Sequence, residues 1–588
     1  MTMEAARDIL GATSPPMQAR AVAFEGLLGW FTPGFTRRGV VLCGTLGFEQ
    51  LSAYRAWRAL ADEVAATGCA CLRFDYPGEG DSGDAGAGRV ASLVASIRRA
   101  IRFLRDEAGV DEIVLVGLRF GGMLAALAAR DGGVDRLVLL SPFATGRAYL
   151  REMQMQARTI LVWPGGVPLR SKPGTINVHG FVLDQDAIED INRIDDQVYA
   201  RANVADILIV DRTPSKILST AMMPGIDIQQ QTFAGFGSLL SGEMNFRSVT
   251  EVVATFRDLN RSIAEYSAHG ACLEPAISRP KVSTPRVAGK DWEEETVFFG
   301  NGLFGILCRA KLPCPEKGSV LFLNSGSYVR SGPGRFTTRT ARRLAAQGID
   351  SLRFDLRGMG DSTDRPDESS AFYNLDFLGD VTLAIDRLKR DHDGPLTVIG
   401  FCSGAYLAFH AACRDDRVTD TVLANLYCFD WPEAVRFESI VGRPTMRSSA
   451  TYARSLLHAN TWRRIIKGEI AVATIAAGLI KLQLKTLAGL SSRILRLHYG
   501  KLRVLDRVAR VRRRGGRFVF AYSADDPALL NITSELGLPV HRFERAVGSR
   551  VEIVADCDHN FSTPESQGAI DSIIFDVIDR RQAQGATS

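Results

Sequence analysis

The sequence predicts an α/β protein made of two tandem domains, each a mostly parallel sheet with helices on both faces. Three observations support this prediction: the length of the chain, an internal repeat, and an alternation of apolar strands with amphipathic helices. A chain of 588 residues is too long for one hydrophobic core and long enough for two. Hydrophobic residues make up 46% and charged residues 23%, which excludes disordered and fibrous classes.

The repeat is clearest at residues 72–83, LRFDYPGEGDSG, and 352–363, LRFDLRGMGDST, which lie 280 positions apart. Each segment follows an alanine-rich helical stretch and precedes a helix with aliphatic residues at helical spacing. A second apolar strand then runs into a glycine turn, GLRFGG at 117–122 and GFCSGA at 400–405. Strand, helix and strand in this order are typical of βαβ units with parallel strands.

A segment rich in proline and small polar residues, 271–290, is the predicted linker. The first domain is therefore expected at 13–270 and the second at 291–580. The last residues, from Arg581 onward, are predicted to be a frayed tail.

Cys402 stands between two glycines, after a β-branched run and before a helix-compatible run. In a turn of this kind the central residue is a nucleophile on a strained corner, where only glycine lets the strand and the helix approach closely. The alternative is a buried small hydrophobe, because free cysteines are common in protein cores. The strand, turn and helix context favours the nucleophile.

The strand ending in R-F-D, the G-x-G-D-S loop and the glycine-flanked turn resemble, in this order, the α/β-hydrolase superfamily. The resemblance extends over both halves and implies two tandem α/β-hydrolase domains, each with a helical cap. Residues 324–335, NSGSYVRSGPGR, are similar to the equivalent loop of exosortase-associated α/β-hydrolases. The cysteine is similar in residue type to the nucleophile of polyhydroxyalkanoate synthases, some thioesterases and dienelactone hydrolases.

In this superfamily the nucleophile is followed by an acid and then a histidine, each after a strand. Asp526, directly before a proline, fits the acid position, and Asp525 is the alternative acid. Two histidines follow the acid, His541 and His559. His541 lies in a segment predicted to be a strand, whereas His559 follows the last predicted strand and is therefore the expected base.

The oxyanion hole is expected to combine the backbone N–H of Ser403 with a donor from the loop after the first long strand of the second half. Gly326 and Ser327 are the candidates in that loop, because the glycine permits a turn that exposes such a donor. Tyr328 and Arg330 either line the site or cover the edge of the sheet.

The first half lacks these parts, since Arg119 stands in the place of Cys402 and Ala234 aligns opposite His559. A guanidinium has no lone pair with which to attack a carbonyl. A catalytically inactive pseudoenzyme domain with a structural or interface role is therefore expected. The alternative is that Arg119 holds an anionic group at the helix N-terminus.

The cap of the second domain is predicted at 431–516, a strongly basic segment whose apolar residues recur at helical spacing. One interpretation is a solvated face. The other is electrostatic guidance of an acidic partner, such as an acyl carrier protein, the phosphates of coenzyme A or an anionic membrane surface. No recognition motif accompanies the basic residues, which argues against nucleic acid.

No apolar run in the sequence reaches the length of a membrane span.

These observations predict acyl transfer through a Cys-His-Asp triad in the second domain, by an acyltransferase or thioesterase acting on a coenzyme A or carrier-protein thioester. One alternative is a hydrolase of small esters or lactones, and another is a non-catalytic tandem binding scaffold. Neither a metal nor an organic cofactor is implied. The two domains are expected to pair within the chain. The ten scattered cysteines favour reduced thiols and a cytoplasmic location, and no signal peptide is expected.

Overall fold

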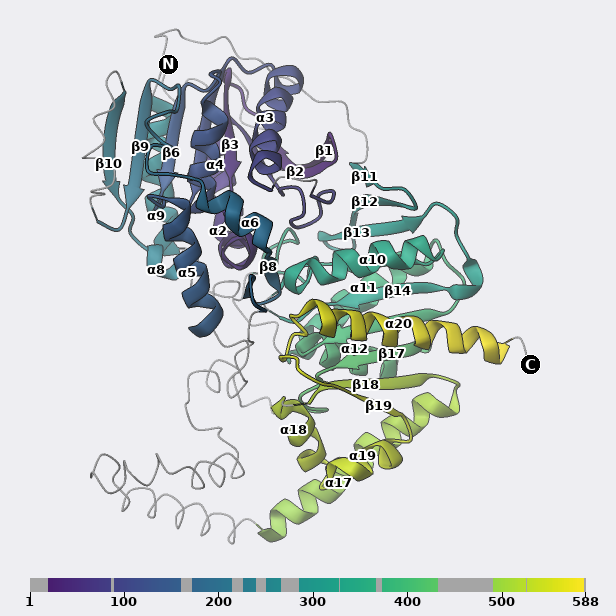
Figure 1. Ribbon diagram of the computed structural model, residues 1–588. Helices are drawn as coiled ribbons and strands as arrows, with labels where there is room; N and C mark the ends of the chain where they lie inside the picture. The colour runs from purple at the N-terminus through teal and green to yellow at the C-terminus, as the bar shows by residue number, and fades with distance from the viewer. Residues whose placement is uncertain are drawn as a thin grey trace, which may run out of the picture. The chain divides into compact units, whose positions relative to one another are not determined.

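The structure is a computed structural model. It describes residues 19–85, 89–159, 172–213, 226–239, 250–265, 285–326, 328–365, 373–431, 490–524 and 526–585. Two large sheets with parallel strands at their centres, accompanied by helices, confirm the predicted α/β class (Figure 1). The chain divides into two compact units. The first contains Met1–Ala157, Ser171–Pro313 and Ser327–Ser369, and the second contains Arg158–Arg170, Cys314–Gly326 and Ser370–Ser588.

The first sheet has eight strands in the order β1-β2-β4-β3-β5-β6-β9-β10. The strands are β1 (Arg20–Phe24), β2 (Leu27–Thr32), β3 (Arg38–Cys43), β4 (Ala70–Phe74), β5 (Glu112–Leu118), β6 (Arg136–Leu140), β9 (Asp206–Asp211) and β10 (Asp227–Thr232). From β4 to β10 every neighbouring pair is parallel, while β2 is antiparallel to both β1 and β4. A small hairpin, β7 (Ile176–Val178) and β8 (Phe181–Leu183), lies apart from this sheet.

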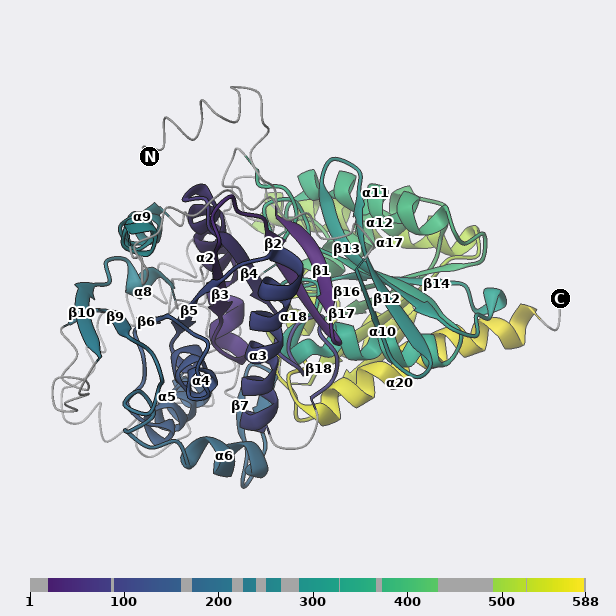
Figure 2. The same cartoon turned by 90° about the horizontal axis from the view of Figure 1, so that it is seen from above.

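Helices cover both faces of the first sheet. They are α2 (Gly47–Ala66), α3 (Arg89–Ala108), α4 (Phe120–Ala129), α5 (Gly146–Thr159), α6 (Gln185–Asn192), α8 (Phe236–Leu239) and α9 (Thr250–Glu265). Val41 packs into a core with α3 and α4, whereas Val40 and Leu42 pack into a second core with α2 and α9. Figure 2 shows these two helix pairs on opposite sides of the strands. Alternate residues of a strand face opposite sides, so a sheet covered on both faces needs apolar residues throughout.

The second sheet has nine strands in the order β11-β12-β13-β15-β14-β16-β17-β18-β19. They are β11 (Arg286–Ala288), β12 (Trp292–Phe299), β13 (Leu303–Ala310), β14 (Ser319–Leu323), β15 (Asp350–Phe354), β16 (Leu396–Phe401), β17 (Val418–Ala424), β18 (Arg517–Ser523) and β19 (Arg550–Val554). Strands β11, β12, β13 and β15 pair antiparallel, and β14, β16, β17, β18 and β19 pair parallel. Apart from β11, this order repeats that of the first sheet, as the internal repeat predicts.

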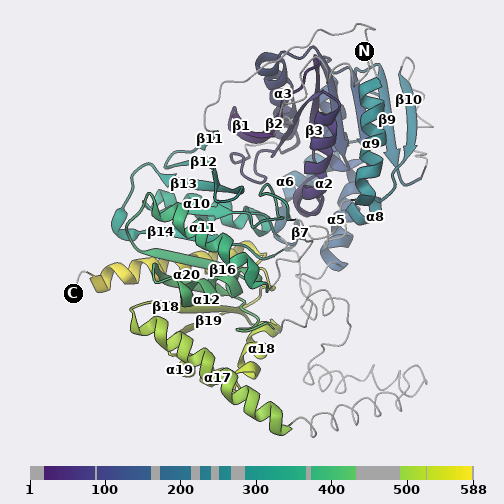
Figure 3. The same cartoon turned by 180° about the vertical axis from the view of Figure 1, so that it is seen from behind.

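The second half also contains helices on its strands (Figure 3). They are α10 (Phe336–Ala346), α11 (Leu378–Lys389), α12 (Ser403–Arg414), α17 (Leu490–Arg513), α18 (Pro527–Glu535), α19 (Val540–Val547) and α20 (Pro564–Gly585), with short 3-10 turns at η2 (Pro315–Lys317), η3 (Pro333–Arg335) and η4 (Leu375–Phe377). In the first unit α10 packs on β13 and β15. In the second unit α12 packs on β14, β16 and β17.

Two local predictions are wrong. His541 lies in α19 and not in a strand, because Phe543 and Val547 are buried at helical spacing and Gly548 ends the helix in the left-handed conformation. The predicted frayed tail is helical through Gly585. Its first residue, Arg581, is anchored by an ion pair of 2.8 Å with the buried carboxylate of Asp420.

Two predicted segments fall mainly on residues that the structure does not describe. Of the linker, 271–290, only 285–290 is described, so the two domain ranges stay predictions. Within the predicted cap, residues 432–489 lie outside the described residues. Among the described helices, none is both long enough and apolar enough to cross a membrane.

Candidate active site

Cys402 lies at the turn between β16 and α12, with φ 53° and ψ −115°. A positive φ is uncommon for a cysteine, and such strain often accompanies functional sites. The flanking glycines are required by close packing. A Cβ on Gly400 would lie 2.3 Å from the carbonyl oxygen of Gly404, and a Cβ on Gly404 would lie 2.3 Å from that of Leu323. The turn therefore presents a thiol where strand and helix backbones touch.

Asp526 and His559 meet at the ends of two neighbouring strands. Asp526 follows β18 as the N-cap of α18, where its Oδ1 accepts a hydrogen bond of 2.8 Å from the Ala528 amide. Its Oδ2 lies 2.8 Å from Nδ1 of His559, in the loop after β19. Both side chains are only 2% exposed. The helix cap thus orients the carboxylate, and the carboxylate orients the imidazole.

The ring of His559 also interacts with the sulfur of Cys402. Burial alone lowers the pKa of His559, but the nearby Asp526 carboxylate and then Cys402 raise it. The net pKa of His559 lies well above its ordinary value. The structure therefore brings together the three residues that the sequence predicts as nucleophile, base and acid, with an imidazole that favours its charged form.

Tyr373 is a neighbour of the thiol that the sequence analysis missed. Its hydroxyl lies 3.3 Å from Sγ of Cys402, and its ring stacks on Trp431 at 4.6 Å. Burial, followed by the proximity of Cys402, holds the pKa of Tyr373 well above its usual range. The phenol therefore keeps its proton and is able to donate it in a hydrogen bond to a thiolate. No motif around this residue marks it in the sequence.

Asn425 and Ser523, at the ends of β17 and β18, fix the loop that carries His559. Asn425 has φ 49°, and its Nδ2 donates to the carbonyl oxygen of His559 at 2.6 Å and to Oγ of Ser523 at 2.9 Å. The Ser523 hydroxyl donates to the carbonyl oxygen of Asp558 at 2.7 Å. The only available signal was their place at the carboxyl ends of predicted strands, where parallel sheets gather functional residues.

Two of the candidate oxyanion-hole residues, Gly326 and Ser403, are hydrogen-bonded to each other. The backbone N–H of Gly326 donates to the side-chain Oγ of Ser403 at 2.7 Å. Ser403 is the first residue of α12, where backbone N–H groups have no partner within the helix. Ser327 and the alternative acid, Asp525, lie outside the described residues.

The two other residues of the loop after β14 are buried in the first unit. Tyr328 packs with Leu51 and Tyr54. Arg330 is 2% exposed, and its guanidinium forms ion pairs of 2.7 Å with Asp81 and 2.5 Å with Asp355. Arg330 is thus part of a buried network of charges.

Arg119 occupies the equivalent turn of the first half, between β5 and α4, with φ 53° and ψ −117°. Its guanidinium lies 3.0 Å from Oε1 of Glu49 and forms a second ion pair with Glu152. The ring of Phe143 lies 4.0 Å from the guanidinium carbon. Two carboxylates of the same half therefore neutralise this cation. Ala234 lies exposed in the turn after β10.

Comparison with protein families identifies the fold. Two separate regions of the chain, 40–179 and 326–440, match a family model described as alpha/beta hydrolase fold. With the two sheets, these matches place the chain in the α/β-hydrolase superfamily, in a two-part architecture. No curated protein matches the chain.

Several solved structures are similar to part of the chain. The esterase Est1E from Butyrivibrio proteoclasticus with bound ferulic acid has 18% identity and a TM-score of 0.31, covering 42% of this chain and 100% of its own. The Pyrococcus furiosus esterase Pf2001 has 12% identity and a TM-score of 0.28, covering 42% of this chain and 90% of its own. XC6422 from Xanthomonas campestris, a serine hydrolase without a lid, has 12% identity and a TM-score of 0.27, covering 43% of this chain and 100% of its own.

Proposed function

We propose that the second half is an acyl-transfer enzyme that works through a covalent acyl-cysteine on Cys402. The observation that carries this proposal is the buried contact of 2.8 Å between Asp526 and His559, with an imidazole whose pKa also responds to Cys402 in the strained turn. A nucleophile, a base within reach of it and an acid that orients the base are the parts that nucleophilic acyl chemistry needs.

In the proposed mechanism His559 takes the proton from Sγ of Cys402, and the thiolate attacks the carbonyl carbon of an acyl substrate. The oxyanion accepts a hydrogen bond from the backbone N–H of Ser403. The leaving group departs with the proton held by His559, and the acyl group stays on the sulfur. His559 then deprotonates water, an alcohol or an amine, which attacks the acyl-cysteine and restores the thiol. Asp526 balances the charge of the imidazolium throughout.

The proposed substrate is a thioester of coenzyme A or of an acyl carrier protein. Exchange of an acyl group between two sulfurs changes little in bond energy, so a cysteine suits a thioester donor. Both donors are anionic, and the described end of the predicted cap supports this choice. The last turns of α17 carry the basic residues Arg503, Arg507, Arg510, Arg512 and Arg513.

The first half is proposed to be catalytically inactive. Arg119 replaces the nucleophile, and its ion pairs with Glu49 and Glu152 leave it no free charge for an anionic ligand.

A cytoplasmic location is proposed because the cysteines, including Cys402, are free and are not joined by disulfides among the described residues.

Intact-protein mass after incubation with a panel of acyl thioesters tests the proposal. Wild type gains the mass of the acyl group, and Cys402→Ala gains none. His559→Ala acylates slowly, since its thiol lacks a base. Cys413→Ala, which removes a half-buried thiol of the same helix, keeps the adduct and serves as the matched control.

The other outcomes separate the alternatives. Turnover of activated small esters or lactones without reaction of any thioester would assign the site to ester hydrolysis. An absence of adduct and turnover with every donor would contradict the acyl-enzyme and leave a binding scaffold as the function.

A further inference from the structure

The two repeated segments fold into equivalent loops, here called the first aspartate loop (75–84) and the second aspartate loop (355–364). In each loop the amide of Asp81 or Asp361 donates to the carboxylate of the loop's first aspartate, at 2.9 and 3.1 Å. In each, a serine hydroxyl donates to the carbonyl oxygen of that first aspartate, at 2.6 Å. Residues 280 positions apart therefore occupy the same place in two copies of one structure. Both loops belong to the first compact unit.

The central ion pairs of these loops are reciprocal. Arg73, on β4, pairs with Asp361 of the second aspartate loop. Arg353, on β15, pairs with Asp81 of the first aspartate loop at 2.9 Å. Arg353 is the counterpart of Arg73, and Asp361 is the counterpart of Asp81, each 280 positions later. One contact is thus made twice, with the roles of the copies exchanged.

A second pair of contacts, between the last aspartate of each loop and an arginine of the other copy, is reciprocal in the same way. Arg335 pairs with Asp84 at 2.7 Å, and Arg55, its counterpart, approaches Asp364 at 4.0 Å, beside the closer ion pair of Asp364 with Arg58. Both arginines lie at or near the helix that precedes the repeated strand, and both aspartates end an aspartate loop. The four positions are again related by 280 residues.

An apolar cluster accompanies the ion pairs. It contains Leu28 and Trp30 of β2 together with Phe304 and Ile306 of β13. Leu28 and Phe304 are equivalent, because the backbone N–H of each donates at 2.9 Å to the serine hydroxyl of its own aspartate loop. The rings of Trp30 and Phe304 lie 4.7 Å apart. The same two strand positions in each copy therefore form both sides of this cluster.

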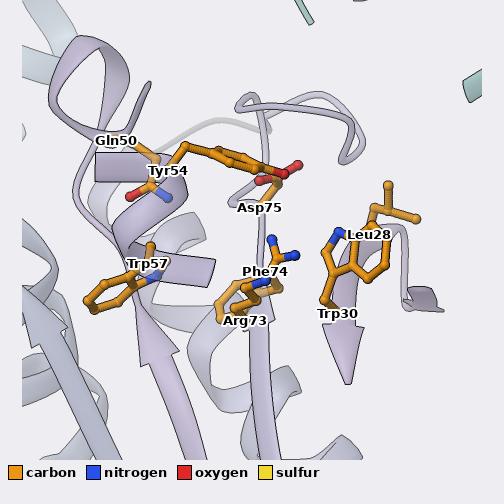
Figure 4. Close-up of a pocket in the computed structure, with 8 residues that line it drawn as sticks. All are labelled: Leu28, Trp30, Gln50, Tyr54, Trp57, Arg73, Phe74 and Asp75. Carbon is orange, nitrogen blue, oxygen red and sulfur yellow. The ribbon is translucent and has the colours of Figure 1, made fainter. Parts of the chain in front are cut away.

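The surroundings of Arg73 show how the charges are enclosed. Figure 4 shows a small pocket in which Arg73 reaches toward Trp30 and Tyr54. Its guanidinium carbon lies 4.9 Å from the Trp30 ring and 5.6 Å from the Tyr54 ring. The Tyr54 hydroxyl donates to Asp361 at 2.5 Å. Cation–π contacts and hydrogen bonds thus satisfy the buried ions.

The electrostatics of the two copies match as well. Burial raises the pKa of Asp81, but Arg330 and Arg353 lower it by more, and the resulting pKa is about 2. Burial likewise raises the pKa of Asp361, and Arg73 and Arg330 bring it below its ordinary value. Both aspartates therefore stay ionised at neutral pH, as the reciprocal ion pairs require.

We infer that the two copies of the fold bind each other through one self-complementary surface, as the subunits of a twofold-symmetric dimer do, and that the first copy serves as the docking partner of the second. In such an interface residue i contacts residue j of the partner, and residue j contacts residue i. Here the partner is the second copy of the same fold in the same chain. This inference is independent of the chemistry proposed for Cys402 and gives the first copy a role that needs no activity.

Hydrogen exchange on the full chain tests the reciprocity. Arg73→Met is expected to speed exchange of the amides in the second aspartate loop roughly 100-fold or more, because the buried carboxylate of Asp361 then keeps only Arg330 as a cationic partner. Arg353→Met is expected to do the same to the first aspartate loop. Arg136→Met removes another fully buried arginine, paired with Asp206 inside the first sheet, and leaves the second aspartate loop protected. The rates do not depend on protein concentration if the pairing lies within one chain.

The decisive measurement is the effect of each arginine variant on the loop of the other copy, because each arginine also lies close to the loop of its own copy. If Arg353→Met leaves the first aspartate loop fully protected, the self-complementary surface does not exist. If a central variant fails to fold, Arg55→Ala and Arg335→Ala apply the same test to the outer pair. Each of these is expected to loosen the loop of the other copy by a smaller factor, and an effect confined to its own copy overturns the inference.

Discussion

The turn at Cys402 and the turn at Arg119 have almost the same backbone and entirely different surroundings. Their φ values are both 53°, and their ψ values differ by 2°, from −115° to −117°. In both, a glycine two residues later lies against the end of a neighbouring strand, β3 or β14, so that a Cβ would lie 2.2 Å from the Cys43 carbonyl oxygen or 2.3 Å from that of Leu323. Close backbone packing therefore maintains this turn whether or not it carries a nucleophile.

The side chains around the two turns make the difference. Cys402 interacts electrostatically with His559, and its sulfur lies 3.3 Å from the Tyr373 hydroxyl. Arg119 instead contacts the carboxylates of Glu49 and Glu152. The same backbone turn can thus present a thiol beside an imidazole, or a cation that carboxylates neutralise locally.

The largest effect is expected from replacing the residues at the two turns, Cys402 and Arg119. Cys402→Ala should lower acyl transfer roughly 10⁴-fold or more, because the covalent step is lost. Arg119→Cys should create no activity, since carboxylates and no imidazole contact that position, and should destabilise the chain by about 3 kcal/mol by leaving Glu49 buried without its cation. Mass adducts and thermal unfolding measure the two effects. Acylation at the new cysteine would contradict the proposed difference between the copies.

Asp526→Asn is expected to lower the rate by about 10³–10⁴-fold, because the amide no longer orients His559 or balances its charge. The change should also lower the pKa of His559, which the carboxylate raises. A raised pKa stabilises the fold fully below the unfolded value of about 6.5, and this contribution is lost as pH rises through the folded value.

The loss of thermal stability in Asp526→Asn should therefore be largest near pH 6, with an unfolded histidine pKa of about 6.5, and smaller at alkaline pH. Asp506→Asn, which removes an exposed carboxylate paired with Arg510, is the control and should change neither rate nor pH dependence. A stability loss independent of pH would show that the Asp526 carboxylate does not set the charge of His559.

Tyr373→Phe is expected to lower the rate roughly 10-fold, the effect of one hydrogen bond to a charged group. This variant keeps the ring that stacks on Trp431 and removes only the hydroxyl. The effect should fall on kcat and leave KM nearly unchanged, because the hydroxyl contacts the sulfur of Cys402. Tyr427→Phe removes a neighbouring phenol and is the control. Equal losses in both variants would argue against a specific contact with the thiol.

The smallest effect on activity is expected from the helices after the turns, where His410 of α12 holds the position of Leu127 in α4, eight residues after the turn residue. Burial, followed by Arg507, lowers the pKa of His410 to about 4, and its Nε2 lies 2.9 Å from the Phe429 carbonyl oxygen. A lowered pKa means that stability present above about 6.5 is lost as pH falls toward the folded value.

His410→Leu should therefore remove about 3 kcal/mol of acid sensitivity between these two pKa values. Thermal unfolding of wild type and variant from pH 7 to pH 4 measures this difference. His541→Gln, at an exposed histidine, should leave the acid dependence unchanged. A variant as acid-sensitive as wild type would mean that other groups of the second half control its acid unfolding.

Local pattern was sufficient for the elements and for the candidate triad. The spacing of glycines around Cys402 and the strand ends before Asp526 and His559 are short-range features, so one sequence was enough to predict these residues. The strand predicted around His541 is the helix α19, because the apolar residues Phe543 and Val547 recur at helical spacing. It also missed Tyr373 and Asn425, whose partners lie 29 and 134 residues away.

The sequence by itself determined that the chain contains the fold twice and that only the second copy retains a cysteine at the turn. Both features depend only on the order of residues along the chain, so the repeat and the glycine-flanked motif show them directly. Only the tertiary structure decided that Arg73 and Arg353 exchange partners across the two aspartate loops, because the pairing of Arg353 with Asp81 joins residues 272 positions apart. Such contacts depend on how two similar surfaces complement each other in space, and no local periodicity encodes that complementarity.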